Sequence, residues 1–227
     1  MPNGSLSLAA TLYLLAFDPG TGKPVTHLGY LVQAGALTEL AQRELLVDAD
    51  GWPKPLPDAR TGDPALDGLL ELIDESRPRR WGTWVGHHPQ VTERAVRDQL
   101  RAAGYLRVST RRVLGLFPVR EYALERPQLV AEMRDEAVGV LAGERPVAEV
   151  SERDAALIAL AAAGGLTTVV THKDLTAHRR RIAELEARSG APGAALEGVA
   201  DQVRAALAAA VATALSVATA AATTTTS

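Results

Sequence analysis

Apolar residues recur at helical spacing along most of the chain, and this pattern predicts a mainly α-helical fold. The first apolar run, residues 6–17, predicts a helix with Ser5 or Ser7 as its N-cap. A second run, residues 27–45, also has its apolar residues close to helical spacing and predicts a buried helix. The turn-rich segment "DPGTGKP" ends the first helix before the second begins.

Two more helices are predicted between residues 61 and 105. A proline-rich stretch, expected to be a loop, leads to the first, which Thr61 or Asp63 can cap. Its apolar stripe is Leu66, Leu69, Leu70 and Ile73. A short helix or turn at "RRWGTWVGHHP" precedes the second, "QVTERAVRDQLRAAGYL", which Gly104 ends. The side chains expected on its buried face are Val91, Ala95, Val96 and Leu100.

The convincing β pattern lies between residues 105 and 124. The segments "YLRVST" and "RVLGLFPVREYAL" hold β-branched and aromatic residues around short polar breaks. They predict a small sheet whose last two strands form a hairpin with its turn near Gly115 to Pro118.

The remainder of the chain is expected to be helical, at residues 128–141, 151–163, 172–188 and about 193–222. The uncharged run 205–222 is about long enough to span a bilayer, but alanine and threonine dominate it, which favours a packed terminal helix. We expect a single domain over residues 5–222 and a disordered tail at 223–227.

Composition and charge narrow the function classes. The chain has no cysteine, which excludes disulfides and thiolate chemistry and suits a reducing interior. Its first residues lack the basic region and cleavage site of a signal peptide, so we expect a cytoplasmic protein. The net charge of −3 provides no global attraction for nucleic acid or anionic lipid, which leaves only a local basic patch.

The motifs of catalysis and metal binding are missing or misplaced. His87 and His88 are adjacent and His172 and His178 are six apart, and neither spacing suits two ligands on one helical face. No serine lies in a nucleophile elbow and no acid–base pair stands out, so we expect no enzyme, cofactor or metal site. In "TGDPALD", helix capping and the helix dipole explain both carboxylates.

Arginine is the residue type that remains. Seven arginines lie within the 27 residues from Arg94 to Arg120, and Arg94, Arg97 and Arg101 share one helical face. A helix followed by a basic hairpin is the outline of a winged-helix regulator that binds DNA. However, the expected tip is Leu-Phe-Pro, which suits a bilayer interface better than DNA phosphates. A third alternative is a hairpin that mediates self-association or partner binding.

Three stretches resemble the Golgi phosphoprotein 3 family in its shorter, actinomycete-type bacterial form: "LTELAQRELL", "TGDPALDGLLELIDESRPRRWGTWV" and "RDQLRAAGYLRVSTRRVLGLFPVREYALERP". The resemblance covers nearly the whole chain. It implies a central helical bundle wrapped by amphipathic helices, with one projecting β-hairpin. Eukaryotic members are non-enzymatic adaptors that bind phosphatidylinositol 4-phosphate and glycosyltransferase tails, and their hairpin is tied to membrane contact and self-association.

The resemblance also implies a lipid pocket, built in the family from a tryptophan, an arginine and two basic residues three apart. Those positions fall near Pro24, Gln33, Gln90 and Glu93 here, so none of the four is kept. We therefore expect other residues to hold a lipid head group, namely Arg94, Arg97, Arg112 and Arg120. The expected membrane or self-association tip consists of Leu114, Gly115, Leu116 and Phe117.

These observations predict a protein peripheral to the inner face of the membrane. Its expected partners are an anionic, phosphoinositide-like lipid, protein clients and a second copy of the chain through the hairpin, but not nucleic acid.

Overall fold

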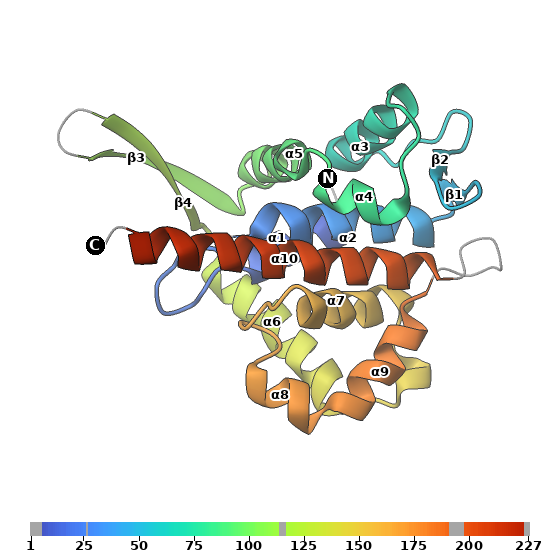
Figure 1. Cartoon of the computed structure of the whole chain (residues 1–227). Helices are drawn as coiled ribbons and strands as arrows, with labels where there is room; N and C mark the ends of the chain where they lie inside the picture. Colours follow the sequence, from blue (N-terminus) through green and yellow to red (C-terminus); the bar gives the residue numbers. More distant parts are fainter. Residues whose placement is uncertain (1–5, 26, 114–116, 191–197, 225–227) are drawn as a thin grey trace.

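The computed structural model describes residues 6–25, 27–113, 117–190 and 198–224. Over these residues the fold is mainly α-helical with two small antiparallel strand pairs, which confirms the predicted fold class. Helices α1 (Leu8–Leu15) and α2 (Leu28–Gln42) lie at the centre. Helices α3, α4 and α5 lie on one side of them and α6 to α9 on the other, with α10 running along the length of the body (Figure 1).

The surrounding elements follow the sequence pattern closely. Helix α3 spans Pro64–Glu75, α4 Trp81–Gly86, α5 Pro89–Ala102, α6 Pro127–Ala142 and α7 Glu152–Ala163. Helix α8 spans His172–Ala177, α9 Arg179–Arg188 and α10 Val199–Thr224, and a short 3-10 turn lies at Val147–Glu149. The predicted start of the last helix at residues 193–197 lies outside the described residues.

The central pair α1 and α2 is buried along almost its whole length. Ser7 caps α1 by accepting a hydrogen bond from the backbone N–H of Ala10, as one of the two predicted caps. A side chain on Gly35 of α2 would come within 2.7 Å of the Leu12 side chain, so glycine is what allows the two helices to approach this closely. The central bundle therefore depends on small residues where its helices cross.

A buried carboxylate joins the same two helices. Glu39 of α2 is only 4% exposed, and its Oε2 accepts a hydrogen bond of 2.6 Å from the backbone N–H of Leu8. Its Oε1 is ion-paired with Arg43 one turn further along α2. Because Leu8 is the first residue of α1, Glu39 satisfies a backbone donor that the helix itself leaves unpaired.

The motif "TGDPALD" forms the predicted cap of α3. The Asp63 carboxylate accepts from the backbone N–H groups of Ala65 and Leu66 and from the side-chain amide of Gln99 on α5. Burial raises the pKa of Asp67, but hydrogen bonds from Thr61 and the Gly62 backbone outweigh it and hold that pKa below its ordinary value. Both carboxylates thus fix the start of α3, and Asp63 also docks it on α5.

Helix α10 packs against the body through one apolar stripe. Its buried residues Val199, Val203, Leu207 and Val211 recur every four positions. Gly82 of α4 lets the helix approach, because a side chain there would contact Ala206 at 3.3 Å. Among the described helices, α10 alone is long and apolar enough to cross a membrane by length and composition, over Val199–Ser216. Its contacts with α2, α4 and α7 agree with the predicted packed terminal helix.

Three local predictions were wrong. The proline-rich segment expected to be a loop contains a strand pair, β1 (Leu46–Asp48) with β2 (Pro53–Pro55), and proline is tolerated there because each strand has only one partner. The predicted helix 172–188 is divided at His178, whose backbone leaves helical values. Val91, expected to be buried, is 52% exposed, because α5 turns its Thr92, Val96 and Leu100 face to the core.

Candidate functional site on the hairpin and helix α5

Strands β3 (Leu106–Val113) and β4 (Phe117–Leu124) form a hairpin that projects from the helical body (Figure 1). The antiparallel register runs from Leu106 opposite Leu124 to Val113 opposite Phe117. The predicted hairpin is therefore confirmed, although its first strand is continuous where the sequence indicated a polar break.

The base of the hairpin is attached to the core. Leu106 is 3% exposed, and the partly buried Tyr122 and Leu124 pack against the core. The backbone N–H of Glu125 donates to the carbonyl oxygen of Tyr105 at 2.8 Å, which closes the base just before β3. The direction in which the hairpin projects is thus set by contacts at its base.

Further out, the described side chains are open to solvent. Those on β3 from Arg107 to Thr110 are exposed, and so are Arg120 and Glu121 on β4. A two-stranded hairpin is at best marginally stable alone in water. A long ribbon with exposed side chains on both faces therefore presents a surface that a partner or membrane can contact.

The tip residues Leu114, Gly115 and Leu116 lie outside the described residues. The backbone of Phe117 begins β4 opposite Val113. The assignment of these four residues to a membrane or self-association tip stays a prediction.

Helix α5 does not bring its first two arginines together at one site. The Arg94 side chain is 76% exposed and lies 3.9 Å from Asp98. The Arg97 side chain is only 23% exposed, and its Nη1 donates to Glu93 Oε1 at 3.0 Å. Each arginine has its own carboxylate, so their shared spacing along the helix does not make a common anion cradle.

Arg97 instead contacts the hairpin. Its guanidinium lies over the Tyr122 ring, 4.9 Å from the ring centroid, a geometry that allows a cation–π interaction. Burial raises the pKa of Glu93, and the Arg97 charge partly opposes this. Burial likewise raises the pKa of Tyr13 on α1 to about 12, against the same opposing charge. Arg97 thus links α1, α5 and β4 at the hairpin base.

The arginines predicted on the hairpin lie further from the body. Arg120 on β4 is exposed and pairs in register with Thr110, and Arg112 pairs with Pro118 nearer the tip. Because positions two apart on a strand share a face, positions 112 and 120 belong to the same face of the ribbon. Of the four arginines predicted to hold a head group, Arg94 on α5 and Arg120 on the hairpin are exposed.

The four positions that the resemblance assigns to a lipid pocket carry no positive charge. Gln33 is fully buried, and its Nε2 donates to the carbonyl oxygens of Trp84 at 3.1 Å and His87 at 3.4 Å. Pro24 forms a bridge with Phe17, and Gln90 is exposed. A side chain on Gly29 of α2 would come within 3.1 Å of Glu93 Oε2, so a carboxylate lies where α5 meets α2. That carboxylate would repel a phosphate.

The adjacent histidines have a packing role. The His87 ring makes an edge contact with Trp84, with ring centroids 5.0 Å apart. Burial, with the nearby charges of Arg79 and His88, lowers the pKa of His87. In the part of the chain that the structure describes, no three histidine or acidic side chains gather in a way that could hold a metal ion.

Sequence reasoning missed the contacts that join the hairpin to the body. The i, i+4 spacing of Glu93 and Arg97 indicated only a solvated ion pair. The ring that Arg97 contacts, Tyr122, lies 25 residues further along the chain on β4, and no local pattern could have assigned it.

Comparison with known families supports the arrangement. Residues 8–214 match the family described as Golgi phosphoprotein 3 (GPP34), a span that includes α5 and the hairpin. A search of curated proteins found no match. The mainly helical body, the projecting hairpin and a match over nearly the whole chain lead to one conclusion: this chain belongs to the Golgi phosphoprotein 3 family.

Proposed function

We propose that this protein is a non-enzymatic, peripheral membrane protein that contacts an anionic lipid surface through its hairpin. The observation that carries the proposal is the projecting hairpin, whose described outer side chains are exposed on both strands. Family membership supports a role of the Golgi phosphoprotein 3 type. The protein would act from the cytoplasm on the inner face of the membrane.

In this proposal the tip residues Leu114, Leu116 and Phe117 enter the interfacial region, and exposed arginines contact lipid phosphates. The head-group contacts fall to Arg94, Arg112 and Arg120. Arg97 is better assigned to positioning the hairpin, because Glu93 neutralises it and Tyr122 covers it. Each basic residue near an anionic surface contributes about 1 kcal/mol, so three of them with a small apolar tip give reversible binding.

The lipid need not be a phosphoinositide. The positions that serve as the pocket in the resemblance carry Pro24, Gln33, Gln90 and Glu93, without a cation among them. General attraction to anionic lipid therefore has more support than recognition of one head group. Protein clients and a homo-oligomer formed through the hairpin belong to the same proposal, because an exposed ribbon can also pair with a partner.

Co-sedimentation with liposomes tests the membrane role. Phosphatidylcholine vesicles are compared with vesicles that also contain phosphatidylinositol phosphate, phosphatidylglycerol or cardiolipin. The double variant Leu116→Asp with Phe117→Asp should lose binding to every anionic vesicle while keeping its helical circular dichroism. The matched control is Leu175→Asp on α8, an exposed apolar residue remote from the hairpin. Retained binding by the double variant would refute the membrane role.

The arginines need a separate comparison. Arg94→Ala with Arg120→Ala should weaken binding to anionic vesicles about thirtyfold, and Arg180→Ala, at a fully solvated position on α9, should not. Mass in solution, measured with and without the tip substitutions, separates self-association from membrane contact. A gel shift with genomic DNA fragments that weakened steeply with salt would instead favour a winged-helix regulator.

A further inference from the structure

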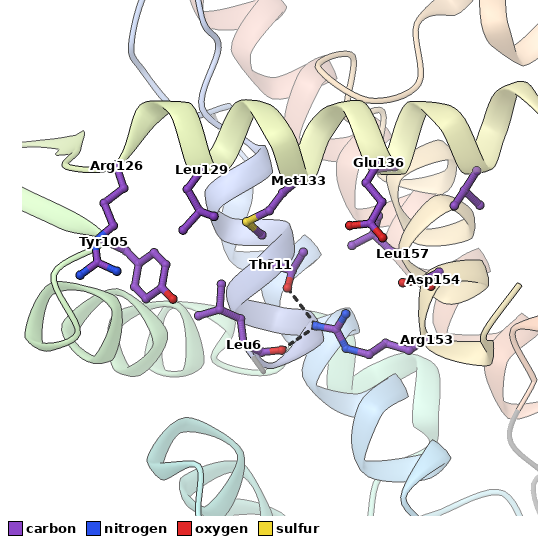
Figure 2. Close-up of a pocket in the computed structure, with 12 residues that line it drawn as sticks. Leu6, Thr11, Tyr105, Arg126, Leu129, Met133, Glu136, Arg153, Asp154 and Leu157 are labelled. Carbon is purple, nitrogen blue, oxygen red and sulfur yellow. Dashed lines mark hydrogen bonds between the residues drawn. The ribbon is translucent and has the colours of Figure 1, made fainter. Parts of the chain in front are cut away.

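A cavity of about 340 Å³ lies between α6 and α7. The start of α1 and the hairpin base close it (Figure 2). Leu6, Leu129, Met133 and Leu157 form an apolar wall, and unbranched methionine adapts to different ligand shapes. The volume lies at the lower end of the range for small-molecule pockets, so a single-chain ligand fits it better than a two-chain lipid.

Four charged side chains also line this cavity, and none of them is ion-paired with another. Arg153 Nη2 donates to the Leu6 carbonyl oxygen at 2.6 Å and to Thr11 Oγ1 at 2.9 Å. The Asp154 carboxylate accepts from Ser151 at the start of α7. Within the described part of the chain, Glu136 has no hydrogen-bond or ion-pair partner. Figure 2 shows Glu136 and Arg153 reaching toward the cavity from α6 and α7.

The fourth charge lies at the opposite end. The Arg126 guanidinium stacks over the Tyr105 ring, 5.0 Å from its centroid, at the base of the hairpin. The cavity therefore has a charged end formed by Arg153, Glu136 and Asp154 and an apolar stretch that runs from Met133 toward Tyr105.

We propose that this cavity binds a single-chain zwitterionic lipid, with its anionic group at Arg153, its ammonium group at Glu136 and its chain along Leu129 and Met133. The charges decide between ligand classes. A purely anionic ligand at Arg153 would lie near Glu136 and Asp154, and a purely cationic ligand at Glu136 would lie near Arg153. A zwitterion pairs with both signs at once, which makes each bond a charge-assisted hydrogen bond.

The length of the apolar wall favours a zwitterionic ligand with a long apolar chain over a zwitterionic amino acid. Helix α6 rises about 10 Å between Glu136 and Leu129, which is longer than the side chain of an apolar amino acid. A single-chain ethanolamine phospholipid has the ammonium donor, the phosphate and a chain that can follow this wall. A free apolar amino acid shares the head chemistry but leaves most of the wall uncovered. The site uses the base of the hairpin only to close one end, and it does not depend on the membrane role proposed above.

The experiment is isothermal titration of the whole protein with monomeric lauroyl lysophosphatidylethanolamine, below its micelle-forming concentration. Laurate, dodecylamine and leucine serve as anionic, cationic and short zwitterionic probes. The lysolipid should bind with one-to-one stoichiometry and about tenfold or more tighter than each of the others, because only it makes both charged contacts and covers the wall. Equal affinity for laurate, dodecylamine and the lysolipid would overturn the proposal, and leucine binding as tightly would exclude the lipid.

Substitutions on α6 locate the site. Glu136→Gln should weaken lysolipid binding about tenfold, since it removes the charge that pairs with the ammonium group. Glu132→Gln, one turn earlier and also exposed, is the matched control and should leave affinity unchanged. Met133→Trp should fill the cavity and abolish binding. Arg153 is left intact because it holds the start of α1. Unchanged binding by Glu136→Gln and Met133→Trp would place the ligand elsewhere.

A variant of the hairpin tip distinguishes the proposed lipid site in the cavity from the proposed membrane contact of the hairpin. Leu116→Asp with Phe117→Asp should bind monomeric lysolipid like the wild type, because the proposed charged contacts and the apolar wall are formed by Leu6 just before α1 and by residues of α6 and α7. Loss of binding in that variant would mean that the tip takes up the lysolipid, which contradicts the cavity site.

Discussion

Helix α2 and the hairpin β3–β4 differ in how far their side chains are buried. Nearly every residue of α2 is buried, and its one buried carboxylate, Glu39, is paired and caps α1. The hairpin is buried at its base, at Leu106, and exposed at Arg107–Thr110 on β3 and at Arg120 and Glu121 on β4. Substitutions around α2 should therefore act on stability, whereas substitutions on the outer hairpin should act on binding.

The largest expected effect is at the core. Trp81 of α4 is fully buried, and its indole N–H donates to Asp48 Oδ1 at 2.7 Å. Trp81→Ala should lower the free energy of unfolding by about 3–5 kcal/mol, since it leaves a large cavity and an unpaired carboxylate. Urea unfolding followed by circular dichroism measures this. A loss below about 1 kcal/mol, the size of an ordinary substitution, would contradict the contrast between the two regions.

An intermediate effect is expected at the hairpin base. Tyr122→Leu removes the ring beneath Arg97 and should cost about 0.5–2 kcal/mol of stability. Amide hydrogen exchange should rise in β3 and β4 and stay unchanged in α2, because the contact holds the ribbon and not the bundle. Arg120→Ala, further out on the same strand, is the control and should change stability by less than about 0.5 kcal/mol. Equal exchange in both variants would show that Tyr122 does not anchor the hairpin.

The smallest effect is a pH dependence that contrasts Glu93 with Asp67. Burial raises the pKa of Glu93 above its ordinary value of 4.5. Because protonation of Glu93 is easier in the folded than in the unfolded chain, it stabilises the fold. This contribution is complete below pH 4.5 and is lost as the pH rises through the raised pKa of the folded protein. Asp67 has the opposite sign, because hydrogen bonds from Thr61 and Gly62 hold its pKa below 3.8, and its contribution is lost as pH falls.

Urea unfolding at a series of pH values measures this contrast. From acid toward neutral pH, Glu93→Gln should gain stability relative to the wild type, and Asp67→Asn should lose it. Parallel profiles for the two variants would mean that their carboxylates do not differ in environment.

Several helix caps and helix ends could be predicted from the sequence because they depend on residues that are close together in the chain. Ser7 and Asp63 cap α1 and α3, and Gly104 follows the end of α5 with a positive φ of 72°. Each is a local interaction between a side chain or backbone and the next turn. The same holds for the hairpin, whose strands are close in the chain.

The predictions failed where contacts between residues far apart in the sequence determine the local structure. The strand pair β1–β2 forms in a proline-rich stretch, and Leu46 at its start is buried in the core. Val91 fits an apolar stripe, yet contacts with α1, α2 and α3 set the buried face of α5 one position away. The sequence did not indicate the role of Arg153, because the oxygen atoms of Leu6 and Thr11 that accept its hydrogen bonds lie more than 140 residues earlier in the chain.

By itself, the sequence determined the mainly helical class, most helix ends and a basic hairpin after an arginine-bearing helix, because propensity, capping and periodicity act over a few residues. Only the tertiary structure decided the roles of the charges. It turned Arg94 to solvent and Arg97 toward Glu93 and Tyr122, and it collected Arg153 and Glu136 around one cavity. The reason is that charge interactions depend on distance and burial, and packing between remote segments sets both.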